Sequence, residues 1–292
     1  MIRKSKGEKV FTLFNYISLG LLAFTTLYPF LYTINLSLST TTEAMRIGFH
    51  LYPREITLTS YNMVMKNQEI LIGYGNTIFR TVFGTTIAIL VTCMFAYPLA
   101  RPNMPMKRTF TIMLIFTMLF SGGLIPNYLL MKNLGLINNR LVYLLPNMLT
   151  AFNVLIVRNY FKSIPESLYE SAKLDGAKDL YILFKIIMPL SKPVLATVAL
   201  WMAVGHWNSW FDGMLYITDN KKQILQIFLQ RIVQGSQTEL VTQGLANPDI
   251  MQFTSETVKS ATIVVAILPI LLVYPFIQKY FVTGIMLGSV KE

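Results

Sequence analysis

The stretch that decides the fold covers residues 163–193 and reads SIPESLYESAKLDGAKDLYILFKIIMPLSKP. It is a long polar segment between two strongly apolar runs. Ile164, Leu168 and Ala172 recur every four residues, which places them on one face of a helix. Gly176 follows where a helix would end in a left-handed residue, a conformation that glycine adopts without steric cost. The stretch therefore predicts a short amphipathic helix that ends in a sharp turn.

A second helical run follows the turn and leads into the next apolar segment. It covers Ala177–Ile187, and we expect Pro189 and Pro193 to break or kink it, because proline lacks an amide donor. The spacing along the whole stretch is Glu170-Ser171-Ala172, three residues, Gly176, nine residues, Ile186, one residue, Met188-Pro189.

This spacing resembles the cytoplasmic loop of permease subunits in bacterial ABC importers. In that family the loop reads Glu-Ala-Ala, three residues, Gly, nine residues, Ile, one residue, Leu-Pro. The present chain departs from it at Ser171 and Met188. The flanking segments Ile164-Pro165-Glu166 and Asp175-Gly176-Ala177 resemble the carbohydrate-uptake branch. The whole chain is similar to maltose-type permeases, and most of all to a subgroup that serves polysaccharide fragments.

The resemblance implies a type I ABC importer permease fold and a set of partners. These are a sibling permease, two ABC ATPase subunits and an extracellular sugar-binding protein, with ATP and magnesium held on the ATPases. It also implies that the loop contacts an ATPase through Pro165, Glu166, Leu168, Glu170, Ala172, Asp175, Gly176 and Pro189. The alternative is a solvated amphipathic connection without a partner.

Composition indicates a polytopic membrane protein. Hydrophobic residues make up 53% of the 292 residues and charged residues 13%, against about 25% charged in ordinary soluble domains. The net charge of +11 does not favour nucleic acid, because the basic residues lie in loops beside apolar runs, where membrane topology explains them. Cys93 is the only cysteine, which excludes a disulfide within the chain and a cysteine-based metal site.

Six apolar runs are long enough to span a bilayer, which needs about 20 residues each. We expect one all-α transmembrane domain over residues 1–292, in the bacterial cytoplasmic (inner) membrane. The predicted spans are Val10–Leu38, Thr77–Leu99, Phe110–Leu130, Leu141–Val157, Ile186–Trp207 and Thr262–Tyr280.

The distribution of basic residues predicts that both termini are cytoplasmic. With that orientation the internal segments carry about 15 of the 25 Lys and Arg residues. The loop 158–192 is then cytoplasmic, as the resemblance requires. The loops 39–75 and 212–257 are external, and the first of them should form short helices at the membrane surface.

Two features interrupt the predicted spans. Arg80 lies at the start of the second span. It either lines a polar path, since a charge within a span needs a partner, or extends to the outer interface; we favour the outer interface. The segment Ser121-Gly122-Gly123-Leu124-Ile125-Pro126-Asn127 breaks the third span. It is either a kink facing the pore or the outer end of the span.

An aromatic and polar cluster ends the fifth span. Sugars offer apolar C–H faces to aromatic rings and hydroxyls to amides, imidazoles and carboxylates. Asn208 and Asp212 stand four residues apart, which would make them neighbours on a helix. The cluster is therefore either a sugar-contacting path or an aromatic belt at the interface. With two histidines in the chain, no metal-ligand set forms. The candidate path residues are Trp201, His206, Trp207, Asn208, Trp210 and Asp212.

The last external loop carries a helical pattern followed by a polar tip. The helical pattern comprises Ile224, Leu225, Phe228, Leu229 and Ile232. By resemblance, the tip at Gln234, Gly235, Ser236 and Gln237 contacts the binding protein. The alternative is an interfacial helix with a flexible end.

Three function classes compete. The resemblance implies an ATP-driven importer of oligosaccharides, including acidic ones such as alginate or pectin fragments, coupled through the Glu170–Gly176 loop. A secondary sugar transporter needs no ATPase but often carries acidic residues at mid-membrane, and the six runs contain almost none. A membrane enzyme would need a catalytic cluster. The chain lacks a phosphate-binding loop, so we expect no ATP hydrolysis, no catalytic residues and no cofactor on this subunit.

Overall fold

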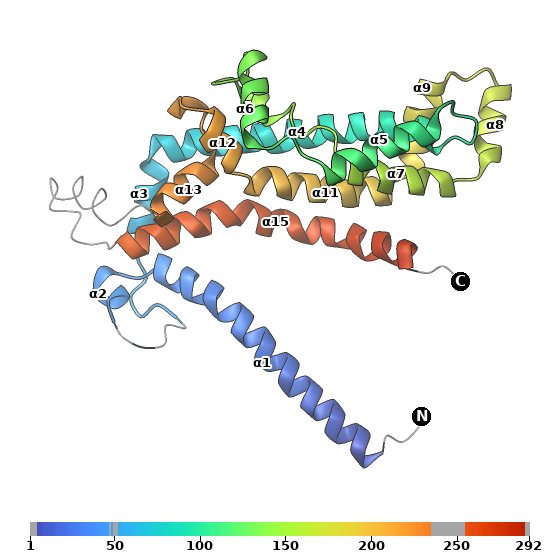
Figure 1. Cartoon of the computed structure of the whole chain (residues 1–292). Helices are drawn as coiled ribbons and strands as arrows, with labels where there is room; N and C mark the ends of the chain where they lie inside the picture. The colour runs from blue at the N-terminus through green and yellow to red at the C-terminus, as the bar shows by residue number, and fades with distance from the viewer. Residues whose placement is uncertain (1–4, 47, 49–51, 235–254, 290–292) are drawn as a thin grey trace. The chain divides into compact units, whose positions relative to one another are not determined.

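The structure is a computed structural model that describes residues 5–46, 48, 52–234 and 255–289 (Figure 1). Over these residues the prediction of an all-helical chain is confirmed. The helices are α1 (Lys6–Ser37), α2 (Thr41–Ala44), α3 (Thr59–Lys66), α4 (Gln68–Ala100), α5 (Lys107–Leu119), α6 (Leu124–Asn133), the 3-10 turn η1 (Arg140–Tyr143), α7 (Ala151–Ser163), α8 (Glu166–Leu174), α9 (Asp179–Ile182), the π turn η2 (Leu183–Ile187), α10 (Met188–Leu190), α11 (Lys192–Asn208), α12 (Phe211–Tyr216), the 3-10 turn η3 (Asn220–Lys222), α13 (Leu225–Gln234) and α15 (Ser255–Ser289).

Long apolar helices account for part of the predicted spans. Within the described ranges, three helical segments are long and apolar enough to cross a membrane: Lys6–Ser37, Gln68–Ala100 and Glu256–Val273. The count rises to five if two bent pairs each form one span. One pair is α5 with α6, bent by 113°, and the other is α9–α10 with α11, bent by 86°. The predicted total of six spans remains a prediction.

The fourth predicted span, Leu141–Val157, is wrong over its first half. The chain there forms η1 and then irregular backbone, and α7 begins only at Ala151. Pro146 supplies the physical reason, because proline disfavours helical geometry in the residue before it. α7 has 13 residues and so spans only about 20 Å.

The break predicted in the third span is present. α5 ends at Leu119, and α6 starts after Gly123, whose φ of +86° lies in a region that favours glycine. Asn127 donates its backbone N–H to the carbonyl of Gly123 at 3.3 Å, which closes the first turn of α6.

The chain forms two compact units, and the first comprises residues 1–68 and 229–268. Ser5 and Glu8 start α1 with a reciprocal capping box. Beyond α1, the predicted short helices of the first loop appear as α2 and α3. The Glu43 carboxylate accepts backbone N–H groups from Arg54 and Glu55, both at 3.0 Å. Residues 54 and 55, shortly before α3, are thereby tied to α2.

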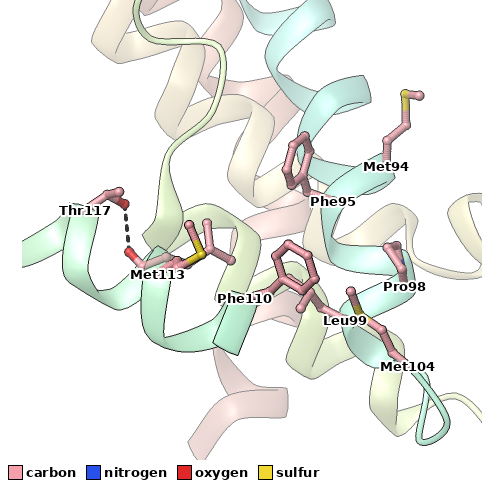
Figure 2. A pocket seen from close by; sticks show the side chains of 9 residues that line it. Met94, Phe95, Pro98, Leu99, Met104, Phe110, Met113 and Thr117 are labelled. Carbon is pink, nitrogen blue, oxygen red and sulfur yellow. Dashed lines mark hydrogen bonds between the residues drawn. The ribbon is translucent and has the colours of Figure 1, made fainter. Parts of the chain in front are cut away.

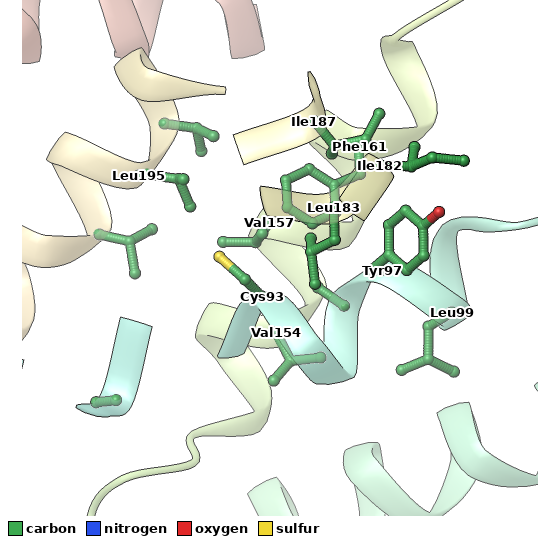
Figure 3. Close-up of a cluster of buried hydrophobic side chains, with 14 of the residues drawn as sticks. Cys93, Tyr97, Leu99, Val154, Val157, Phe161, Ile182, Leu183, Ile187 and Leu195 are labelled. Carbon is green, nitrogen blue, oxygen red and sulfur yellow. The ribbon is translucent and has the colours of Figure 1, made fainter. Parts of the chain in front are cut away.

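The second unit comprises residues 69–228 and 269–292 and contains the main hydrophobic core. Figure 3 shows this core, where side chains from the second half of α4 meet those of α7, η2 and α11. Cys93 lies fully buried within it. Figure 1 places α8 and α9 at one end of α4 and α12 at the other. α4 thus joins two separate clusters of polar residues, which are described next.

Candidate functional site

α8 and the turn after it adopt the geometry that the sequence predicts. Gly176 has a φ of +78°. Its N–H donates to the carbonyl of Lys173 at 3.0 Å, and the N–H of Ala177 donates to that of Ala172 at 2.9 Å. These two bonds satisfy carbonyls that the helix end leaves open. A Cβ placed on Gly176 would meet no atom within 4 Å, so backbone conformation alone makes glycine suitable here.

The face predicted for α8 is only partly buried. Ala172 packs into the core, and Ile164 packs against that core from the residues before α8. Leu168, in contrast, is 43% exposed, and Leu174 is 89% exposed. Glu166, Glu170 and Asp175 are exposed as well. α8 therefore presents two leucines and three carboxylates to its surroundings.

The run after the turn differs from the predicted single helix Ala177–Ile187. It forms α9, the π turn η2 and α10 in succession. A proline ring clashes with the carbonyl four residues earlier, and the wider turn just before Pro189 accommodates it. Pro193 breaks no helix, because it stands in the first turn of α11, where its absent N–H costs no bond.

A polar cluster beside α8 was not found by sequence reasoning. The Asp179 carboxylate accepts hydrogen bonds from Lys173 Nζ at 3.0 Å, from the Tyr169 hydroxyl at 3.1 Å and from the Tyr97 hydroxyl at 3.4 Å. Arg101 stacks on both tyrosine rings. The available signal was the spacing of four residues in two pairs, Tyr97 with Arg101 and Tyr169 with Lys173. That signal is too common to single out a site.

The ion pair of Lys173 and Asp179 should be insensitive to pH between about pH 5 and pH 9. The hydrogen bond from Lys173 lowers the pKa of Asp179 below 3.8. The contribution of Asp179 to stability is therefore complete above its ordinary pKa and is lost as pH falls through the lowered value. The hydrogen bond to Asp179 raises the pKa of Lys173 above 10.5. The contribution of Lys173 is complete below that ordinary value and is lost as pH rises through the raised one.

Thermal unfolding of the purified protein and of Asp179→Asn measures this directly. The difference between their midpoints should stay constant across that range. A difference that titrates within it would contradict the assignment of the pair.

A buried ion pair joins the other end of α4 to α12. Both guanidinium Nη atoms of Arg80 donate to the carboxylate of Asp212, one of them at 3.1 Å to Oδ1. Asp212 also accepts from Ser209 Oγ at 3.1 Å and from the N–H of Gly213 at 2.9 Å. The Arg80 guanidinium lies 5.1 Å from the centroid of the Tyr143 ring. Both charges are thus neutralised inside the protein.

The prediction that Arg80 extends to the outer interface is wrong. Its side chain is 1% exposed, and its partner Asp212 comes from a segment 132 residues later. Because the local sequence does not reveal a partner so far along the chain, it favoured a position of the Arg80 side chain at the outer interface.

Further contacts bind the same end of α4 to the segment after α12. Asn76 Nδ2 donates to the carbonyl of Gln223 at 2.7 Å and to that of Lys221 at 3.1 Å. Thr77 Oγ1 accepts the N–H of Leu225 at 2.9 Å. Sequence reasoning missed these contacts as well, because they also connect residues that lie far apart in the chain. Together with the ion pair they fix the segment between α12 and α13 against α4.

The candidate sugar path does not form one surface. His206 is buried and packs on Gly84 so closely that a Cβ there would lie 2.8 Å from His206 Nε2. Trp207 is also buried and meets Tyr74 edge-on, with ring centroids 6.2 Å apart. Trp201 is partly exposed instead, 6.2 Å from the Phe152 ring centroid.

Asn208 and Asp212 are not neighbours on one helix, contrary to the prediction. α11 ends at Asn208, and α12 starts at Phe211 after an extended Ser209. Asn208 is exposed, whereas Asp212 turns to Arg80. Trp210 is the residue just before α12, and its ring meets the Phe211 ring edge-on, with 5.8 Å between the centroids.

Comparison with known proteins places this architecture in a family. The family model described as "Binding-protein-dependent transport system inner membrane component" matches residues 70–286, a range that includes both polar clusters. The chain belongs to this family.

Several relatives of this permease match it nearly end to end. Protein LplC of Bacillus subtilis (strain 168) is 40% identical over 99% of this chain and 98% of its own length. The polygalacturonan/rhamnogalacturonan transport system permease protein YtcP of the same organism is 39% identical over 97% and 99%. A chain in the crystal structure of a bacterial ABC transporter involved in the import of the acidic polysaccharide alginate is 36% identical, with a TM-score of 0.90 over 96% and 100%.

These matches confirm the predicted type I ABC permease fold and the location in the inner membrane as a multi-pass protein. The orientation of the termini and the roles assigned to individual site residues stay predictions.

An apolar groove lies between α4 and α5 of the permease, with a volume of about 560 Å³ (Figure 2). Its lining residues are Met94, Phe95, Pro98, Leu99, Met104, Phe110, Met113, Leu114 and Thr117. The one hydroxyl among them, on Thr117, already donates to the carbonyl of Leu114 at 2.8 Å. The groove therefore offers little to sugar hydroxyls, which need polar partners.

The predicted contact with a binding protein lies mostly outside the described residues. Gln234 is the last residue of α13, whose helical pattern is confirmed. Gly235, Ser236 and Gln237 lie beyond the part of the chain that the structure describes.

Proposed function

We propose that this chain is one of two permease subunits in an ATP-driven oligosaccharide importer, and that α8 couples it to the ATPases. The observation that carries the proposal is the α8–Gly176 turn. It presents exposed leucines and carboxylates in a loop whose residue spacing resembles that of ABC importer permeases. Membership in a binding-protein-dependent transport family supports it.

The substrate class proposed is acidic polysaccharide fragments. The support comes from two matches that cover nearly the whole chain, one named for polygalacturonan and rhamnogalacturonan transport and one for alginate import. Arg80 supplies no free cation for such a sugar, because Asp212 neutralises it. We therefore expect selectivity for acidic sugars to reside largely in the binding protein or the sibling subunit.

The proposed cycle is alternating access. An ATPase would bind α8 through its exposed residues and the adjoining Pro165, Asp175 and Gly176. Closure of the two ATPases around ATP would move α8 as a rigid body. The permease would then open outward to receive sugar from the binding protein, whose contact we place near residues 234–237. Such a change requires partners that bind the two states with different affinity.

The test is ATPase activity of the complex purified with its partner subunits. It is measured without additive, with binding protein alone, and with binding protein plus neutral or acidic oligosaccharides. We expect stimulation only when binding protein and an acidic oligosaccharide are both present. Stimulation by neutral sugars alone would overturn the substrate class. Absence of an associated ATPase, or activity indifferent to all additions, would overturn the proposal itself.

A further inference from the structure

Arg101 lies between two tyrosine rings that belong to different helices. Its guanidinium carbon stands 4.6 Å from the ring centroid of Tyr97, in the last turn of α4, and 3.7 Å from that of Tyr169, in α8. Both distances are within the range of about 6 Å in which a cation is attracted to an aromatic face. The planar guanidinium suits such stacking better than an ammonium. Arg101 therefore joins α8 to the end of α4.

The two rings are held in place from outside the stack. Both tyrosine hydroxyls donate to the Asp179 carboxylate, at 3.4 Å from Tyr97 and 3.1 Å from Tyr169. Lys107 Nζ donates to the carbonyl of Arg101 at 2.6 Å, which fixes the backbone of the arginine. The cluster thus ties α4, α8 and the start of α9 together.

Among the contacts that hold α8 against α4, the stack of Arg101 on the two tyrosine rings is the strongest candidate, because the neighbouring polar contacts are weaker. Lys173 and Asp179 keep 38% and 58% of their side chains exposed, and exposed ion pairs contribute little. The Nε atom of Arg101 is buried and finds no hydrogen-bond partner among the described residues. A cavity of about 470 Å³ borders the same residues, so dense apolar packing does not replace the stack there.

We infer that Arg101 is a positioning residue that transmits movement of the coupling helix α8 to α4. α4 has 33 residues and extends for about 50 Å. Arg80, which pairs with Asp212, lies in the same helix 21 residues before Arg101, about 30 Å away at 1.5 Å per residue. A movement of α4 at the Arg101 stack would therefore be passed along one continuous helix toward this pair. This inference rests on the proposed function, in which an ATPase moves α8.

The test compares sugar imported per ATP hydrolysed in proteoliposomes that hold the complete complex. Arg101→Ala should lower this ratio about tenfold, and Arg101→Lys should lower it too, because lysine keeps the charge but loses the planar stack. Arg108→Ala is the matched control, since Arg108 is an exposed arginine in the first turn of α5, seven residues after Arg101. It should leave the ratio unchanged. A purely structural defect would reduce import and hydrolysis together and preserve the ratio.

A second pair of variants keeps the inference testable if Arg101→Ala does not assemble. Tyr169→Phe retains the ring and should preserve most of the ratio, whereas Tyr169→Leu should lower it as Arg101→Ala does. An unchanged ratio in Tyr169→Leu, or in an assembled Arg101→Ala, would overturn the role of the stack while leaving ATP-driven import intact. Import by the wild-type complex without ATP would instead overturn the proposed function, and this inference with it.

Discussion

Gly176→Val is expected to abolish sugar import while the chain still inserts into the membrane and assembles. The φ of +78° at Gly176 is unfavourable for L-residues, by about 1–2 kcal/mol in general and by more for a β-branched side chain. Because no atom lies within 4 Å of the added Cβ, the effect is backbone strain rather than collision. That strain would unwind the end of α8 and change its angle to the rest of the loop. Import into proteoliposomes and the amount of assembled complex are the two measurements.

Two control variants distinguish an effect of the location of Gly176 next to α8 from a general effect of backbone strain. Gly135 also has a positive φ, +69°, and a Cβ added there would likewise meet no atom within 4 Å, so Gly135→Val introduces comparable strain away from α8. It should leave most import intact. Gly176→Asn should retain much of it as well, because asparagine tolerates left-handed geometry. Normal import by Gly176→Val would count against α8 as a rigid coupling element.

Removal of one partner of the buried ion pair should destabilise the protein by about 3–5 kcal/mol, because an uncompensated charge stays buried. Arg80 is 1% exposed and Asp212 15%, so water cannot replace the lost partner at Arg80. Asp212→Ala would leave the guanidinium with the Ser209 carbonyl, at 3.2 Å, and the Tyr143 ring. We expect a large fall in the midpoint of thermal unfolding. Unfolding is measured on the protein in detergent, with its intrinsic fluorescence as the readout.

The double variant Arg80→Met with Asp212→Leu provides the sharper comparison. Replacement of both charges by apolar groups of similar size removes the buried charge altogether, and it should recover most of the midpoint. Lys222→Ala serves as the surface control, since it breaks the exposed pair with Asp219 and should change the midpoint little. A double variant as unstable as the single ones would show that these side chains act through packing.

Local patterns were predictable from the sequence, and long-range pairings were not. α8 and its Gly176 turn follow from residues within one short stretch, so spacing and glycine chemistry sufficed. α13 followed from its helical spacing in the same way. The pairing of Arg80 with Asp212 joins residues 132 positions apart, and no periodicity reveals such a contact.

Two errors have a common physical origin. The fourth span was placed over Leu141–Val157 because hydropathy alone ignores the helix-breaking effect of Pro146. The pairing of Asn208 with Asp212 assumed a continuous helix, whereas the chain turns at Ser209 and starts α12. In both cases a continuous helix was assumed across residues where the helix is interrupted. The stack of Arg101 on Tyr97 and Tyr169 was missed for another reason, since it depends on how α8 folds back on α4.

The most direct test of the proposal that this chain belongs to an ATP-driven importer is to measure which energy source drives sugar import. Proteoliposomes would carry the complete complex, with ATP on the side of the ATPase subunits and the binding protein with an acidic oligosaccharide on the other. We predict accumulation that requires both ATP and the binding protein and that an ion gradient cannot replace. Accumulation driven by an ion gradient in the absence of ATP would contradict the account and indicate a secondary transporter.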